Sequence, residues 1–296
     1  MFEQVFNLLD PHPSDIQSIW PASSSGFAWW YVDLVGKDGM GIVIIWGSRN
    51  PFLPCATPSE STPSLSVVVY RHGQRLFSLH QTYSEHDVRL TTDTWVLDKS
   101  TINWGRRFGQ EVLTLQLDCA VPGQTDRLQG NFCVWGRPKS LPNALFPDEK
   151  LGWRPFLLNG KGEGKVTWGR EIIGIEGDAY YDSNWSSVDA TDLGIDRWCW
   201  GRVSSERRTL VWFQTANHPT CQVLVDDHSG ETILSGTAEF VLEEGYPTRF
   251  GVRRARHILL TVGDEEFRIS VGKPGEDGPY YQRTFVHTTL DGESFE

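Results

Sequence analysis

The sequence predicts an all-β protein built from two antiparallel β-barrel or sandwich domains, and three observations support this. Apolar and polar residues alternate with a period of two over many short segments, as in half-buried antiparallel strands. Turn-forming pairs such as Asp38-Gly39, His72-Gly73 and Gly263-Asp264 separate these segments. The composition is rich in aromatic and turn-forming residues, with 13 Trp, 29 Gly and 16 Pro among 296 residues. A disordered chain or a coiled coil does not have this composition, so both classes are excluded.

In the N-terminal half, alternation and β-branched or aromatic residues predict strands. Leu113, Leu115 and Leu117 share one face of a predicted strand, and the polar residues between them share the other. The strand candidates of this half are 28–35, 41–47, 64–71, 75–81, 111–119 and 127–135. Only residues 1–9 have a weak helical pattern, and the four prolines of 51–64 predict a loop.

The C-terminal half has the same character, with strand candidates at 209–215, 221–225, 238–244, 257–263 and 266–272. Between the halves, the segment 136–150 contains three prolines and has little periodicity. We therefore predict a domain boundary there, with an N-terminal β domain over residues 1–140 and a C-terminal β domain over 141–296.

Charge and motif content exclude several functions. The net charge of −11 argues against a nucleic-acid partner, which requires a basic face. The longest apolar stretch, Met40–Gly47, is far shorter than the roughly 18 residues of a membrane span, and the N-terminus lacks the basic region of a secretory signal. The five cysteines are widely spaced and the eight histidines are scattered. We therefore expect a cytoplasmic protein with reduced thiols, no metal and no cofactor.

The densest group of chemically capable side chains lies in GDAYYDSNWSS, residues 177–187, and RWCWGR, residues 197–202. In an unbroken strand, Asp178, Tyr180, Asp182 and Asn184 would point to one face. A carboxyl group among aromatic side chains loses hydration, which raises its pKa and keeps it protonated near neutral pH as a proton donor. Aromatic faces can then stabilise a cation. The alternative is structural: Asp182 and Asn184 cap a turn while the aromatic residues fill a core.

These segments resemble a known family. GDAYYDSNW followed by RWCWGR is similar to the signature of the carotenoid 1,2-hydratases, also called hydroxyneurosporene synthases. FAWWYVDLVGKDG with IVIIWGSRNPF resembles their N-terminal segment, GWRPF their central tryptophan motif, and PYYQRTFVHTTLDGE their closing strand. The four segments occur in matching order along most of the chain.

The resemblance implies two lipocalin-like β-barrels and cofactor-free protonation of a terminal double bond in an apolar polyene, followed by capture of the carbocation by water. It assigns the acid to Asp182, its neighbouring tyrosine to Tyr180 and the central tryptophan to Trp153. The residues that it places at the substrate are Tyr181, Asn184, Trp185, Trp198 and Trp200. Arg154 and Arg202 lie beside aromatic residues of these motifs, where a structural role is the default and recognition of a substrate oxygen is the alternative.

One departure keeps three functions open. The family has a histidine two positions before the central tryptophan, and Leu151 occupies that position here. The same superfamily looks to include Diels–Alderases, which need mainly a shaped apolar pocket. The hypotheses are a hydratase of an isoprenoid or carotenoid-like polyene, a ring-forming cyclase or pericyclase of secondary metabolism, and a non-catalytic carrier.

Each hypothesis implies an apolar or aromatic small-molecule partner. Transient membrane contact would follow from drawing a polyene out of a bilayer, although the net charge opposes docking on anionic lipid. The sequence gives no indication of the oligomeric state.

Overall fold

The structure, a computed structural model, describes thirteen segments of the chain: 26–49, 62–91, 93–138, 150–189, 192–194, 198–215, 220–229, 233–243, 245–248, 250–251, 253–278, 282–290 and 293–295. Within these segments the secondary structure is β throughout, apart from one 3-10 turn at Glu85–Asp87, which confirms the predicted fold class. The predicted helix at 1–9 and most of the predicted loop at 51–64 lie outside the described residues.

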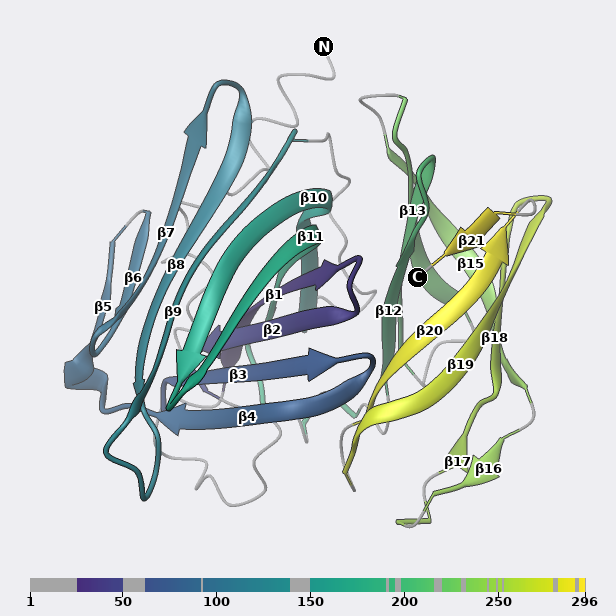
Figure 1. The fold of residues 1–296 in the computed structure, drawn as a ribbon. Helices are drawn as coiled ribbons and strands as arrows, with labels where there is room; N and C mark the ends of the chain where they lie inside the picture. Colours follow the sequence, from purple (N-terminus) through teal and green to yellow (C-terminus); the bar gives the residue numbers. More distant parts are fainter. Residues whose placement is uncertain are drawn as a thin grey trace. The chain divides into compact units, whose positions relative to one another are not determined.

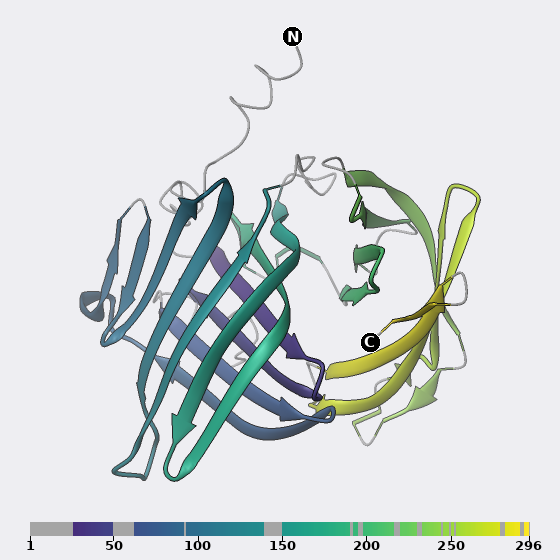
Figure 2. The same ribbon diagram turned by 45° about the horizontal axis from the view of Figure 1, so that its top comes forward.

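The first sheet is antiparallel and has eleven strands in the order β4-β3-β2-β1-β11-β10-β9-β8-β7-β6-β5 (Figure 1). Consecutive strands pair with each other except β4 and β5, which are the two edges of the sheet, and β11 returns to pair with β1, which joins the two halves of the sheet. Figure 2 shows this sheet curled. Its strands are β1 (Phe27–Gly36), β2 (Met40–Gly47), β3 (Ser64–Arg71), β4 (Gln74–Thr82), β5 (Val88–Leu90), β6 (Thr94–Leu97), β7 (Ser100–Arg107), β8 (Gln110–Ala120), β9 (Arg127–Gly136), β10 (Leu151–Trp168) and β11 (Glu171–Ser186).

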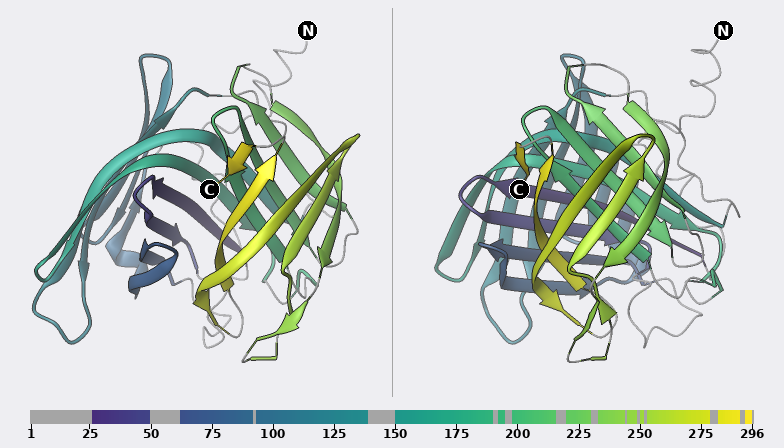
Figure 3. Two further views of the ribbon diagram at one scale, coloured as in Figure 1. Left: turned by 45° about the vertical axis from the view of Figure 1, so that its right-hand side comes forward. Right: turned by 90° about the vertical axis from the view of Figure 1, so that its right-hand side faces the viewer.

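The second sheet is also antiparallel and has eight strands in the order β12-β13-β14-β15-β18-β19-β20-β21, drawn in green to yellow in Figure 3. Its strands are β12 (Trp198–Ser204), β13 (Arg208–Thr215), β14 (Thr220–Asp227), β15 (Ile233–Glu243), β18 (His257–Val262), β19 (Glu265–Asp277), β20 (Gln282–Leu290) and β21 (Glu293–Phe295). A separate two-stranded ribbon consists of β16 (Tyr246–Pro247) and β17 (Arg253–Arg254).

The two sheets belong to two compact units, and the division between them differs from the predicted one. The first unit consists of Met1–Val69, Leu76–Pro138 and Asn143–Leu193, and the second consists mainly of Gly194–Glu296. The division falls after Leu193, not after residue 140, because β10 and β11 pair with β9 and β1 and so complete the first sheet. The prolines of 136–150 indicate an interruption in the strand pattern along the chain. They do not indicate which strands pair with β10 and β11, because those partners can be distant in the sequence.

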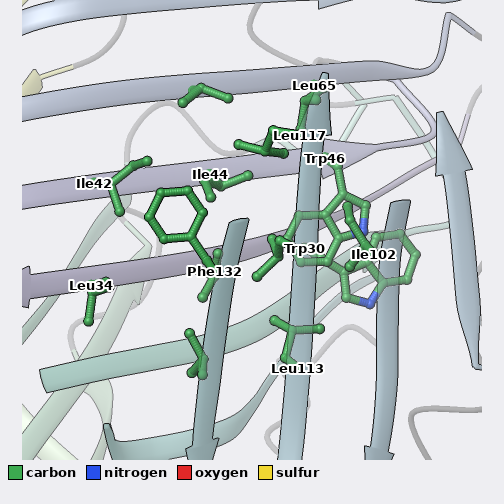
Figure 4. Packing of buried hydrophobic residues seen from close by; sticks show 14 of the residues in the cluster. Trp30, Leu34, Ile42, Ile44, Trp46, Leu65, Ile102, Leu113, Leu117 and Phe132 are labelled. Atoms are coloured by element: carbon green, nitrogen blue, oxygen red, sulfur yellow. The ribbon is translucent and has the colours of Figure 1, made fainter. Parts of the chain in front are cut away.

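Each sheet packs one face into a hydrophobic core, and the alternation of each strand determines which residues contribute. In β1, Ala28, Trp30, Val32 and Leu34 point into the core of the first unit. Figure 4 shows part of this core, where Trp30 and Trp46 meet aliphatic side chains from β2, β3, β7 and β8. The core of the second unit includes Val203, Leu210, Trp212, Val223, Leu260 and Ile269.

Three predicted turns occur where the sequence places them. Gly39, Gly73 and Gly263 have positive φ angles and close the β1–β2, β3–β4 and β18–β19 hairpins. A left-handed backbone is favourable for glycine because it has no Cβ atom.

Candidate functional site

The candidate site is built around Asp182 near the C-terminal end of β11. Because side chains alternate along a strand, Tyr180, Asp182 and Asn184 point to one face of the first sheet, as the sequence predicts. This face is opposite to the one that packs into the core, where Ala179 and Tyr181 lie. Trp153 of β10 pairs with Asn184 and therefore lies on the same face as Asp182.

Three neutral donors surround the Asp182 carboxyl group. The Tyr180 hydroxyl donates to Oδ2 at 2.7 Å, and the Trp153 indole Nε1 donates to the same oxygen at 3.0 Å. The Asn184 side-chain amide donates to Oδ1 at 3.0 Å. All four side chains are buried, and Asp182 itself is only 2% exposed. The three hydrogen bonds thus hold the carboxyl group in place, and none of the three donors carries a positive charge.

Burial raises the pKa of Asp182 from its ordinary value of 3.8 to about 7. Loss of hydration is the largest cause, because it disfavours the charged carboxylate. The hydrogen bonds from Tyr180, Trp153 and Asn184 stabilise the carboxylate and act in the opposite direction, while the negative charge of Asp33 adds to the increase. At neutral pH the acid form and the carboxylate are therefore both populated, as a general acid requires.

Strand β1 supplies part of this site that the sequence analysis did not assign. Trp29, Tyr31 and Asp33 pair with Asn184, Asp182 and Tyr180 respectively, so they lie on the same face. The Tyr31 ring packs edge-on against Tyr180 with centroids 6.1 Å apart. The signal was present in the alternation of FAWWYVDLV, but only the β1–β11 pairing makes these residues neighbours of Asp182.

Two further features of this face affect how water could be bound near Asp182. Leu151 is two residues before Trp153 on β10 and so shares its face, which places an apolar side chain where the resembling family has histidine. The Asn184 side-chain oxygen Oδ1 is buried and has no hydrogen-bond partner among the described residues. An unpartnered buried acceptor of this kind can bind a hydroxyl group or a water molecule.

Three of the predicted substrate-binding residues lie on the opposite face of the first sheet. Tyr181 packs into the core against Trp46, Trp104 and Phe156, and Trp185 packs against the same core from its edge. Arg154 is buried with its guanidinium 5.3 Å from the centre of the Phe156 ring, and burial lowers its pKa to about 10. Strand alternation therefore separates these three side chains from Asp182.

The remaining three predicted residues, Trp198, Trp200 and Arg202, belong to β12 in the second unit. They alternate with Cys199 and Val203, which contribute to the core of that unit, so they lie on the other face of the second sheet. All three are partly exposed.

Two searches over the described residues bear on other kinds of site. Within the described part of the chain, no group of three or more His, Cys, Asp or Glu side chains is arranged to hold a metal ion. Among the same residues, no helix is long and apolar enough to cross a membrane.

Comparison with known proteins gives consistent results. A family model for the carotenoid hydratase CrtC matches residues 47–296. The acyclic carotenoid 1,2-hydratase of Rubrivivax gelatinosus is 24% identical over 92% of this chain and 68% of its own length. Among solved structures, a protein of Nitrosomonas europaea assigned as an AttH has a TM-score of 0.63 at 16% identity, covering 95% of this chain and 94% of its own. The crystal structure of CghA has a TM-score of 0.56 at 9% identity, covering 92% and 87% respectively. The two solved structures share the fold.

Proposed function

Because the chain belongs to the carotenoid hydratase CrtC family, we propose that it adds water across a terminal carbon–carbon double bond of an acyclic, carotenoid-like polyene, with Asp182 as the proton donor. The observation that carries this proposal is a buried carboxyl group whose pKa is about 7 and which is surrounded by three neutral hydrogen-bond donors. An acid of this pKa combines a populated proton with a useful tendency to release it at neutral pH.

In the proposed reaction, the Asp182 proton bonds to the less substituted carbon of the double bond. The π electrons form that C–H bond and leave a tertiary carbocation on the adjacent carbon. A water oxygen then bonds to the cationic carbon and releases one proton, which returns to the Asp182 carboxylate. The net change is addition of one water molecule, and Asp182 ends in its starting form.

Each neighbour has a role that follows from its contact. The Tyr180 hydroxyl and the Trp153 indole donate to Oδ2, so they stabilise the carboxylate that forms when the proton leaves. They leave Oδ1, which accepts one bond from Asn184, as the oxygen that carries the transferable proton. The half-buried rings of Trp29 and Tyr31 lie on the same face, where aromatic faces can stabilise the cation.

Asn184 is suited to orient the water. Its amide nitrogen donates to Asp182, while its oxygen Oδ1 accepts no hydrogen bond within the described part of the chain, so this oxygen can accept one from the attacking water. This role would replace the one that a histidine at position 151 could perform in relatives. Protonation by Asp182, the absence of a cofactor and these residue roles are all part of the proposal.

The test is Asp182→Asn, assayed with an acyclic carotenoid in ¹⁸O-labelled water. We expect the variant to remain folded and to lose about 10²–10⁴-fold in turnover, which is the range for removal of a general acid. The matched control is Asp178→Asn. Asp178 lies on the same strand and face but is partly exposed and ion-paired with Lys161, so turnover should be unchanged. Retention of turnover in Asp182→Asn would contradict the proposal.

A second candidate, ring formation, is favoured by Leu151, because an apolar side chain beside Trp153 reduces the means of binding water near the cation. The same labelled-water experiment separates the hypotheses. Hydration gives a product that carries the label, cyclisation gives an isomer of unchanged mass, and a non-catalytic carrier returns the polyene unaltered.

A further inference from the structure

The tip of the β7–β8 hairpin carries an apolar side chain that the fold does not use. Phe108 is 97% exposed, which is the highest value among the exposed large hydrophobic residues of the described segments. It also has a left-handed backbone, with φ of 52° followed by 74° at Gly109. Two consecutive positive φ angles define a two-residue hairpin turn in which asparagine or aspartate is favoured at the first position and a bulky residue is strained.

Residue choice at this turn therefore opposes the stability of the isolated protein. Phenylalanine is unfavourable both for its backbone conformation and for its contact with water. At the corresponding position of the β3–β4 hairpin, the chain has His72, a polar residue, before Gly73. A local choice that the folded chain does not reward is typical of a position that contacts something else.

The surroundings of Phe108 are positively charged although the protein is acidic. Arg106 and Arg107 precede it and are exposed, and Arg137 is exposed directly after Gly136, which pairs with Glu111 across from the hairpin. The buried Glu111 carboxylate pairs with Arg106 at 2.6 Å, so Arg107 and Arg137 remain as the excess charge. An exposed aromatic residue flanked by cations fits the interface of a bilayer with anionic headgroups.

The hairpin also lies at the relevant end of the first sheet. Since β7 to β11 pair in sequence, the β7–β8 turn is at the end opposite to the β8–β9 and β10–β11 turns (Figure 1). Asp182 lies near the end of β11 that is remote from the β10–β11 turn, and so toward the same end of the sheet as Phe108.

We propose that the β7–β8 hairpin tip is a membrane contact, in which Phe108 enters the interface of a bilayer while Arg107 and Arg137 meet anionic headgroups. This inference rests on the proposed function for its purpose, since an apolar polyene is held in lipid and the enzyme must meet it there. The contact is weak and reversible, because one aromatic residue and two cations give marginal anchoring.

The experiment is co-sedimentation of the full-length protein with vesicles of equal parts phosphatidylcholine and phosphatidylglycerol, compared with vesicles of phosphatidylcholine alone. We expect Phe108→Asn to lower the partition coefficient about tenfold or more, and to leave the thermal midpoint unchanged or raised because asparagine favours this turn. Arg107→Gln should weaken binding to the anionic vesicles only. The matched control is Ile172→Asn, which removes a residue that is 73% exposed at the other end of the sheet and should leave partitioning unchanged.

Three outcomes would overturn the proposal. The first is failure of the wild-type protein to bind the anionic vesicles, and the second is equal partitioning of the wild type and Phe108→Asn. The third is a difference in sedimentation coefficient between the wild type and Phe108→Asn in the absence of lipid. Such a difference would indicate that the hairpin tip contacts a second copy of the chain. Because vesicle binding is measured without turnover, its failure leaves the Asp182 chemistry intact, and loss of hydratase activity leaves the membrane contact testable.

Discussion

Replacing Asp182 by asparagine should change how the stability of the protein depends on pH. The Asp182 carboxyl group is buried, and its pKa rises from 3.8 to about 7 on folding. A raised pKa means that the folded state holds the proton more tightly than the unfolded chain. The stability contributed by this group is therefore fully present below about pH 4 and is lost as the pH rises through about 7.

The magnitude follows from the same change in pKa. One pKa unit corresponds to 1.36 kcal/mol, so an increase from 3.8 to about 7 corresponds to about 4 kcal/mol. Asparagine has the shape of the protonated acid but cannot ionise. Its amide oxygen can accept the bonds from Tyr180 and Trp153, and its NH₂ group can donate to the unpartnered Oδ1 of Asn184 after that amide rotates.

The assay is chemical denaturation of the wild type and Asp182→Asn at a series of pH values from about 4 to about 9, which spans the range between the two pKa values. The free energy of unfolding of the variant, relative to the wild type, should increase by up to about 4 kcal/mol across this range. Contributions from other titrating groups cancel in the difference.

A difference between Asp182→Asn and the wild type that stays constant with pH would refute this reasoning. It would show that Asp182 has the same pKa in the folded and unfolded states, and that the desolvation inferred from its burial is compensated. The proposal of a neutral-pH general acid would then lose its physical basis.

Three further predictions concern the same strands. Turnover should fall as the pH rises above about 7, because Asp182 then loses its proton. Tyr180→Phe removes a donor that stabilises the carboxylate, so it should move this fall in the profile of kcat against pH to higher pH. If Tyr180 has only a structural role, the fall should stay at the same pH. Leu151→His should increase the fraction of product that carries ¹⁸O from labelled water, as measured by mass spectrometry, and an unchanged fraction would argue against a water-binding role for this position. Gly152→Ala should lower the free energy of unfolding by about 1–3 kcal/mol in denaturation experiments, since a Cβ atom there would lie 2.1 Å from the Trp185 ring; full stability would mean that the ring moves away readily.

The sequence predicted much of the strand content because period-two alternation is a local property. The candidate 111–119 lies within β8 and 127–135 within β9, and β8 buries the predicted face of Leu113, Leu115 and Leu117. The short strands β5 to β7 were not predicted, since segments of three to eight residues with mixed character give little periodicity. The predicted boundary at residue 140 likewise reflected local composition, while the pairing of β10 and β11 with distant strands places the division after Leu193.

By itself the sequence determined that Tyr180, Asp182 and Asn184 share one face wherever this segment is extended, because residues two apart point the same way along a strand. The structure then showed an unbroken strand over Glu171–Ser186 and not the turn that was the alternative. It also contained the motifs by which the family can be recognised. Only the tertiary structure decided which other residues join them. Tyr31 and Asp33 reach Asp182 and Tyr180 because β1 pairs with β11 across about 150 residues of chain, a distance over which local pattern carries no information. The same pairing and alternation directed Tyr181 and Trp185 into the core, so sequence proximity to Asp182 did not make them its neighbours.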